Sequence, residues 1–168
     1  MSGLDGFAVR NVTPSDWDRV MAVLAEWWEG RDLSALLPRL FFQHFCTTSW
    51  LVERDGELVA FLVGFLCPTH DDEAYIHFVG VAPELRGRGI AQGLYELFFD
   101  SARAQARSVV RAITSPVNKA SIACHSHLGF VMLPGDGEQD GVPIWLDYDG
   151  PGQHRVRLER RLRLEGEA

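Results

Sequence analysis

A glycine-rich turn in this sequence has the residue types that bind a phosphate group. It follows an apolar segment that ends in Val79-Gly80-Val81, and it leads into a helical pattern. Gly87 and Gly89 carry no Cβ atom that would hold a bulky ligand away from the backbone N–H groups. The first turn of the following helix adds unpaired N–H donors and a positive dipole end. We therefore expect a pyrophosphate to bind at the turn formed by Arg86, Gly87, Arg88, Gly89, Ile90 and Ala91. Val79, Gly80 and Val81 are expected to contact the same ligand.

Two other nucleotide-binding patterns fit this turn poorly. The dinucleotide fingerprint needs Gly or Ala at the position that Gln92 occupies, and a P-loop needs a Gly-Lys-Ser/Thr sequence that the turn lacks. The turn is therefore interpreted as a different kind of anion site.

A second group of polar residues recurs at helical spacing after Ser115-Pro116, a pair typical of a helix start. On a helix, Asn118 and His125 lie about 20° apart in angle and about 10 Å apart along the axis. Ser121 lies between them, so one flank of this helix is polar. The core-facing flank is expected to carry Val117, Cys124 and Leu128.

A histidine lies in the apolar strand that precedes the glycine turn. Period-two alternation places His77 on the same strand face as Tyr75, Val79 and Val81. A neutral imidazole can accept a proton near pH 7. The alternative is a structural histidine bonded to a neighbouring carbonyl.

Length and composition indicate one globular domain over residues 1–168. The net charge of −7 argues against a nucleic-acid partner, and no apolar run approaches the about 18 residues of a membrane span. No signal peptide is visible, and the scattered Cys46, Cys67 and Cys124 favour reduced, mostly buried thiols in a cytoplasmic protein. Residues 136–141 begin like a calcium loop, but neither its final glutamate nor a helix follows, so no metal is expected.

The order of strand and helix patterns favours an α/β (α+β) fold. Strands are expected at 7–12, 50–54, 58–66, 75–81, 109–113, 130–133 and 155–160. Helices are expected from Pro14 to near Gly30, at about 34–47, at 90–107 and at 116–129. Asp55-Gly56 predicts a hairpin. This order predicts a mixed sheet with helices on both faces.

The glycine turn and the second polar group together resemble the GNAT superfamily of N-acetyltransferases. Arg86, Gly89 and Ala91 fill the acyl-CoA-binding motif Gln/Arg-x-x-Gly-x-Gly/Ala of that family. Asn118, followed by a helix and Leu128-Gly129-Phe130, is similar to its second motif. The resemblance covers about residues 51–131.

The resemblance implies a single GNAT domain with a mostly antiparallel sheet and acetyl-CoA as co-substrate. The strands at 75–81 and 109–113 would be parallel neighbours that splay apart, with pantetheine between them. The backbones of Val79 and Val81 would grip the pantetheine amides, and Asn118 and Ser121 would lie near the thioester.

The resemblance also implies catalytic roles for two histidines, although both depart from the family pattern. Relatives often have Tyr at the position of His125, placed to protonate the departing CoA thiolate. They often have Glu at the position of His77, acting as the base that takes the acceptor proton. Imidazole could do either job, since its pKa is near 6.5. The alternatives are that CoA leaves as an unaided thiolate and that both histidines are structural.

The expected function is transfer of an acetyl group from acetyl-CoA to a primary amine by direct attack in a ternary complex. A non-catalytic acyl-CoA-binding or sensing module and a protein N-terminal or lysine acetyltransferase are the alternatives. A homodimer is one option for the assembly.

The acceptor is expected to be a small-molecule or peptide amine, with a cationic one favoured. Acidic residues gather at 71–73 and 136–149 and could steer a cation, although they could also be plain solvated charge. Its pocket could be lined by Trp27, Trp28, Phe41 and Phe42, which are equally compatible with core positions.

Overall fold

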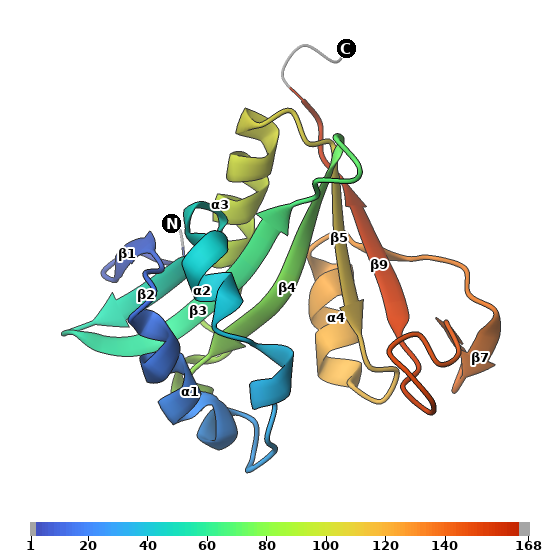
Figure 1. Ribbon diagram of the computed structural model, residues 1–168, viewed down its shortest axis with the longest axis horizontal. Helices are drawn as coiled ribbons and strands as arrows, with labels where there is room; N and C mark the ends of the chain where they lie inside the picture. Colours follow the sequence, from blue (N-terminus) through green and yellow to red (C-terminus); the bar gives the residue numbers. More distant parts are fainter. Residues whose placement is uncertain (1–2, 165–168) are drawn as a thin grey trace. The chain divides into compact units, whose positions relative to one another are not determined.

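The computed structural model describes residues 3–164, in which strands and helices alternate (Figure 1). The strands are β1 (Ala8–Asn11), β2 (Trp50–Arg54), β3 (Glu57–Leu66), β4 (Glu73–Val81), β5 (Val109–Thr114), β6 (Val131–Met132), β7 (Gly137–Gln139), β8 (Val142–Ile144) and β9 (Val156–Arg161). The helices are α1 (Asp16–Trp27), α2 (Leu40–His44), α3 (Ile90–Ala104) and α4 (Lys119–His127). None of the described helices is long and apolar enough to cross a membrane.

The strands form a mixed sheet in the order β1-β2-β3-β4-β5-β9-β6, with β7 and β8 as a separate pair. The pairs β1–β2, β2–β3, β5–β9 and β6–β9 are antiparallel, whereas β4 and β5 are parallel. The parallel ladder joins residues 73–75 to residues 109–111. The predicted fold class is therefore confirmed, including its parallel strand pair.

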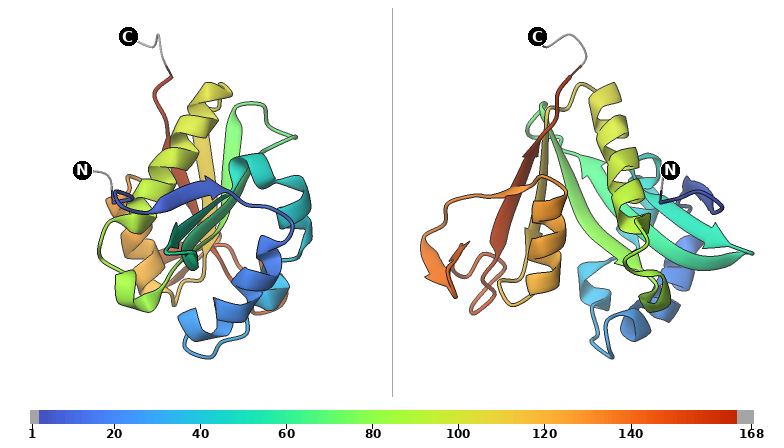
Figure 2. Two further views of the ribbon diagram at one scale, coloured as in Figure 1. Left: turned by 90° about the vertical axis from the view of Figure 1, so that its left-hand side faces the viewer. Right: turned by 180° about the vertical axis from the view of Figure 1, so that it is seen from behind.

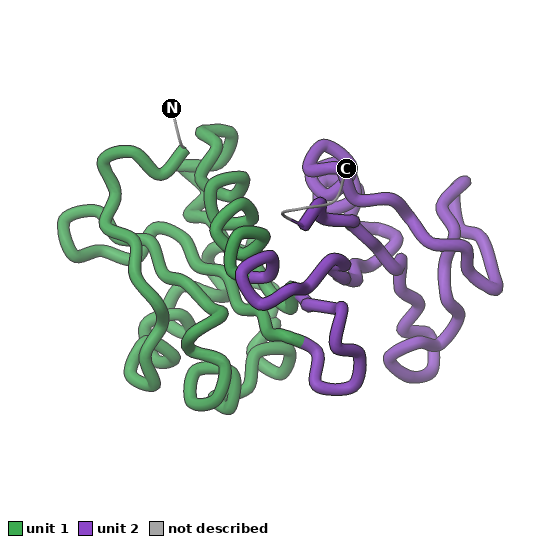
Figure 3. Tube along the Cα trace, turned by 90° about the horizontal axis from the view of Figure 1, so that it is seen from above, with its two compact units in different colours: residues 1–66, 76–101 green, residues 67–75, 102–168 purple. Residues whose placement is uncertain are grey.

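The chain divides into two compact units, and β4 contributes to both (Figure 3). Unit one comprises residues 1–66 and 76–101, and unit two comprises residues 67–75 and 102–168. The glycine turn lies in unit one, and α4 lies in unit two. The single domain over residues 1–168 and the splaying of β4 from β5 both concern the placement of these units, and they stay predictions.

In unit one, helices cover both faces of the sheet. Figure 2 shows α3 on one face of strands β2 to β4 and the helices α1 and α2 on the other. The apolar stripes of the helices account for this packing, because Val20, Leu24 and Trp27 of α1 are buried, as are Ile90 and Leu94 of α3. The prediction of helices on both faces is therefore confirmed here.

The expected helix at about 34–47 is wrong in length. The structure has a 3-10 turn at Ser34–Leu36, the short α2 and a second 3-10 turn at Cys46–Thr48. The physical reason is Pro38, which has no N–H and disfavours helical geometry at Leu37 before it. Leu37 indeed has φ −130° and ψ 64°.

The β2–β3 hairpin has the turn that its sequence predicts. Asp55 and Gly56 adopt φ values of 54° and 82°. Positive φ at both central residues is the type I′ geometry that matches the twist of the two strands.

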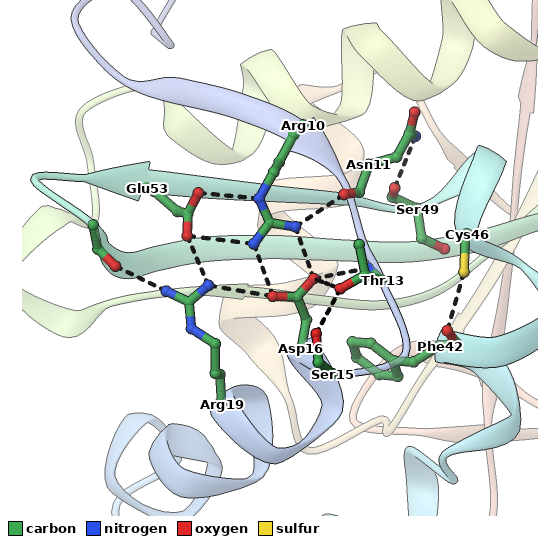
Figure 4. Close-up of polar contacts among 11 residues, drawn as sticks. Arg10, Asn11, Thr13, Ser15, Asp16, Arg19, Phe42, Cys46, Ser49 and Glu53 are labelled. Carbon is green, nitrogen blue, oxygen red and sulfur yellow. Dashed lines mark hydrogen bonds and ion pairs between the residues drawn. The ribbon is translucent and has the colours of Figure 1, made fainter.

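The start of α1 is fixed by a buried carboxylate (Figure 4). Asp16 accepts bonds from the N–H and the hydroxyl of Thr13, which tie the first residue of α1 to the segment before it. It also pairs with Arg10 at 2.7 Å and Arg19 at 3.2 Å, and both arginines contact Glu53 of β2. This network, which we call the Asp16 cluster, ties β1, α1 and β2 together.

We expect Asp16→Asn to lower the free energy of unfolding by about 2–3 kcal/mol, because it leaves the charged donors around it poorly satisfied. Burial alone would raise the pKa of Asp16, but the bonds from Arg10 and Thr13 outweigh it and hold that pKa well below its usual range. The stabilisation is therefore complete above the unfolded pKa near 4 and is lost as the pH falls below it. Thermal unfolding at pH 7 and pH 3 checks this, and an equal fall in Tm of both proteins on acidification would contradict it.

In unit two, an ion-pair triad crosses three strands. Arg111 of β5 donates to Glu73 of β4 at 2.8 Å and also contacts Glu159 of β9. Pairs between adjacent strands of this kind fix the register of a sheet. The expected strands near 130–133 and 155–160 are confirmed, whereas β7 and β8 fill a stretch that had been expected to be irregular.

Candidate active site

The glycine turn of unit one presents a row of uncommitted backbone donors. Within the described residues, the N–H groups of residues 87–92 donate to no protein acceptor, and the first helical bond runs from Gly93 N–H to the Gly89 oxygen at 2.9 Å. Gly87 and Gly89 have φ values of +76° and +81°, and Arg88 between them does not have a positive φ. Alternation of this kind makes a concave nest of N–H groups that binds anions. We call residues 87–92 the N–H nest.

The two glycines of the nest are needed for conformation more than for clearance. A Cβ built on Gly87 would meet nothing within 4 Å, and one built on Gly89 would lie 3.4 Å from Gly3 Cα. Conversely, a Cβ on Gly3 would lie 2.2 Å from the Gly89 oxygen. The amino-terminal segment thus occupies the side of Gly89 that had been assigned to a ligand, and the positive φ explains the glycine.

The three residues of β4 assigned to ligand binding lead into the nest, but their contacts differ. A Cβ on Gly80 would lie 2.6 Å from Phe61 and 2.7 Å from Trp28, so this glycine is required by packing. The carbonyl of Val81 accepts a bond from Arg86 Nε at 3.1 Å. Val79 is half-buried.

Arg86, the first residue of the motif, uses its side chain within the protein. Its second guanidinium bond goes to the carbonyl of Trp27 at 2.5 Å, and its N–H donates to Pro83 O at 3.3 Å. Arg88, which belongs to the nest, is exposed. The uncommitted donors of this turn are therefore its N–H groups rather than the Arg86 guanidinium.

His77 makes two contacts within unit one. Its Nε2 lies 2.5 Å from the carbonyl of Leu36, and its ring stacks on Phe41 with centroids 4.2 Å apart. A carbonyl only accepts, so Nε2 carries the proton. The neutral tautomer then has its lone pair on Nδ1.

The α4 residues lie in unit two, and their polar contacts are local. Asn118 is the N-cap of α4, and its Oδ1 accepts from Ser121 N–H at 3.1 Å. His125 Nδ1 lies 2.8 Å from the carbonyl of Ser121 and 3.3 Å from its hydroxyl. The structure thus brings together the three polar residues that the helix wheel places on one flank.

The opposite flank of α4 does not have the predicted burial. Val117 is 68% exposed and Cys124 is also exposed, whereas His125 and Leu128 are buried. Leu128 is therefore buried as predicted, but Val117 and Cys124 are not. His125 of the polar flank faces inward instead, because it packs edge-on against the buried Phe130 at 5.0 Å. The expectation of mostly buried cysteines is wrong for the same helix, and Cys46 and Cys67 are only half-buried.

Burial lowers the pKa of His125, and the bond to the Ser121 carbonyl offsets this only in part. The ring is therefore neutral near pH 7, with its Nδ1 proton committed to a carbonyl. The contact between Nδ1 and the Ser121 carbonyl and the burial of the ring therefore favour the structural alternative for His125.

We expect His125→Gln to change kcat by no more than about threefold and to alter acid stability instead. Because the folded pKa is lowered, the stabilisation by His125 is complete above the unfolded pKa near 6.5 and is lost as the pH falls below it. The fall in Tm between pH 7 and pH 5.5 should be smaller in the variant. A loss of about 100-fold in kcat in a folded variant would restore the acid role.

The acidic segment at 136–149 is largely committed to its own loop. Asp136 accepts from Leu146 N–H at 2.8 Å, Asp147 from Gly152 N–H at 2.7 Å, and Asp149 pairs with Arg155 at 2.7 Å. These bonds favour a structural role over steering of a cation. Among the described residues, no group of three His, Cys, Asp or Glu side chains could hold a metal ion.

The four candidate pocket aromatics divide into two kinds. Trp27 and Phe42 are core residues, whereas Trp28 and Phe41 are half-buried. Only the second pair remains able to contact an acceptor. Phe41 stacks on the ring of His77.

A groove beside α3 is a feature that the sequence reasoning missed. It encloses about 410 Å³ between the Gly3–Leu4 segment and the α3 face with Gln92, Glu96 and Asp100. The signal for it was an isolated helical glycine, since a Cβ on Gly93 would lie 2.5 Å from Leu4. Leu97 lines this groove and is half-buried.

Comparisons with known proteins agree with this fold and motif. Residues 17–130 match the Acetyltransferase (GNAT) family. The chain is 30% identical over 154 residues to L-2,4-diaminobutyric acid acetyltransferase of Vibrio parahaemolyticus, a match that covers 90% of this chain and 82% of the relative.

Two solved structures are similar in fold. Ard1 from Thermoplasma volcanium has a TM-score of 0.73 at 19% identity, covering 94% of this chain and 99% of that one. The protein yncA from Salmonella typhimurium, solved with its cofactor acetyl-CoA, has a TM-score of 0.65 at 17% identity, covering 96% and 97%.

The chain belongs to the GNAT family of acetyltransferases. It is an acetyl-CoA-dependent N-acetyltransferase.

Proposed function

We propose that this enzyme acetylates a primary amine of a small diamino acid of the 2,4-diaminobutyrate class. The observation that carries the proposal is the 30% identity to a diaminobutyric acid acetyltransferase over 82% of that relative. A free diamino acid also agrees with the acidic loop of unit two, whose carboxylates are bonded locally and offer little to a polycation.

Acetyl-CoA is proposed to bind in unit one with its pyrophosphate on the N–H nest. The nest combines donors that no protein group uses with the positive end of the α3 dipole. This arrangement binds an anion without needing a basic side chain, which agrees with the engagement of Arg86 elsewhere.

The acceptor amine is proposed to attack the thioester carbonyl directly. The new N–C bond forms as the C–S bond breaks, and the sulfur leaves with the electron pair as a thiolate. The amine proton passes to Nδ1 of His77, whose Nε2 proton stays on the Leu36 carbonyl. The Leu36 carbonyl and the stacked Phe41 ring hold the imidazole in place. No proton from His125 is required.

An acceptor panel with thiol detection tests the proposed substrate class. L-2,4-diaminobutyrate should give a kcat/KM at least about tenfold above that of putrescine, a monoamino acid and a basic peptide. Putrescine tests the carboxylate, and the monoamino acid tests the side-chain amine. Better turnover of the peptide would favour the protein acetyltransferase alternative and contradict the proposal.

A further inference from the structure

The guanidinium of Arg86 joins the end of β4 to the end of α1. Its Nε donates to Val81 O at 3.1 Å, and its Nη2 donates to Trp27 O at 2.5 Å. The residue directly precedes the N–H nest. The Arg86 side chain therefore ties the start of the nest to the end of α1.

The Trp27 carbonyl is a helix-end group that the backbone does not satisfy. The preceding carbonyls of Leu24, Ala25 and Glu26 accept the N–H groups of Trp28, Gly30 and Glu29. Trp27 O receives Arg86 instead. A positive charge at a helix C-terminus is favourable in addition to the hydrogen bond.

The chain beyond Trp27 is held at its other end by His77. Residues 28–36 fold through local turns, such as Arg31 N–H to Trp28 O at 3.1 Å and Ser34 N–H to Asp32 Oδ1 at 2.9 Å. At the far end, the Leu36 carbonyl is bonded to His77 Nε2. We call residues 28–36 the strapped segment, because side chains of β4 and of its following turn hold both ends.

We infer that Arg86 is a positioning residue that couples the CoA site to the strapped segment. This inference rests on the proposed binding of pyrophosphate at the nest. An anion on the nest orders the turn that begins at Arg86, and Arg86 then fixes the helix end from which the strapped segment starts. The segment ends at Leu36, whose carbonyl orients His77, the proposed base for the acceptor amine. The order of the segment therefore affects acceptor binding. By linkage, CoA and the acceptor raise each other's affinity by the same factor.

The test compares the wild type with Arg86→Met and with Arg54→Met, a control that removes an exposed positive charge from the end of β2. Calorimetry measures the Kd of L-2,4-diaminobutyrate with and without CoA. Hydrogen exchange is measured on the free proteins and, for the wild type, also with CoA bound. We expect CoA to tighten acceptor binding about tenfold in the wild type and in Arg54→Met. In Arg86→Met the factor should fall to about twofold or less, and the amides of residues 28–31 and 88–93 should exchange faster together.

A different pattern would overturn the inference. If Arg86 bound phosphate directly, Arg86→Met would weaken CoA binding and its salt dependence while leaving the coupling factor and the exchange of the free protein unchanged. Failure of the proposed CoA site would appear in the wild type itself, as nest amides that CoA does not protect. If Arg86→Met does not fold, Arg86→Gln, which retains one donor group, is measured in the same way.

Discussion

Replacing Gly89 with valine should weaken CoA binding by at least about 100-fold in a protein that remains folded. Gly89 has φ +81°, a conformation that a β-branched residue adopts only with strain. Relief of that strain would turn the N–H groups of the nest away from a common centre. The new side chain would also press on Gly3, whose Cα lies 3.4 Å from the Cβ position. Calorimetry with CoA gives the affinity.

Gly56→Val is the matched control for backbone strain. Gly56 has φ +82°, and a Cβ there meets nothing within 4 Å, but it lies in the β2–β3 turn. Both variants should lose a similar part of their stability, and only Gly89→Val should lose CoA. Unchanged affinity in a folded Gly89→Val protein would remove the nest from the account.

Replacing His77 should lower kcat by about 100-fold at pH 7, with little effect on CoA affinity. The ring takes the amine proton at Nδ1 in the proposed reaction, while Nε2 serves the Leu36 carbonyl. Alanine removes both functions. Glutamine retains an N–H donor for Leu36 but supplies no base.

The comparison of His77→Ala with His77→Gln separates the two roles of this residue. If His77 is the base, both variants should be about equally slow. If it only holds Leu36, glutamine should recover most of the activity that alanine loses, and the base would have to be sought elsewhere. Steady-state kinetics with saturating acetyl-CoA gives kcat for each variant.

Local sequence rules predicted the parts of the fold in which one residue type has few alternatives. Asp55-Gly56 predicted the β2–β3 hairpin, and the apolar periodicity after Pro14 predicted α1. The glycine turn was also predictable, since positive φ at alternate positions requires glycine. The mixed sheet followed from the order of elements along the chain, and its parallel pair from the family resemblance.

Features that depend on tertiary packing could not be predicted in this way. Gly80 was assigned to ligand binding, but its missing Cβ makes room for Phe61 and Trp28, which are distant in sequence. The inward flank of α4 was misassigned because a helix wheel ranks polarity, whereas Phe130 beyond the helix determines that His125 is buried. The Asp16 cluster likewise draws Arg10 and Glu53 from two separate strands.

The histidines illustrate the same limit at the level of chemistry. The sequence placed imidazoles at both positions where relatives often have an acid and a base, and it treated them alike. In the structure, His125 is buried with a lowered pKa, whereas His77 is only half-buried and bonded to a loop carbonyl. Environment, not residue type, therefore distinguishes the two histidines, and the proposed roles differ accordingly.

The most direct measurement of the central claim is an amide NMR titration of the protein with CoA and with pantetheine, which lacks the phosphates. If the N–H nest holds the pyrophosphate, CoA should shift the amide resonances of Gly87, Arg88, Gly89, Ile90 and Ala91 strongly, and pantetheine should leave them nearly unchanged. Nest resonances that stay in place while CoA shifts amides elsewhere would contradict the account.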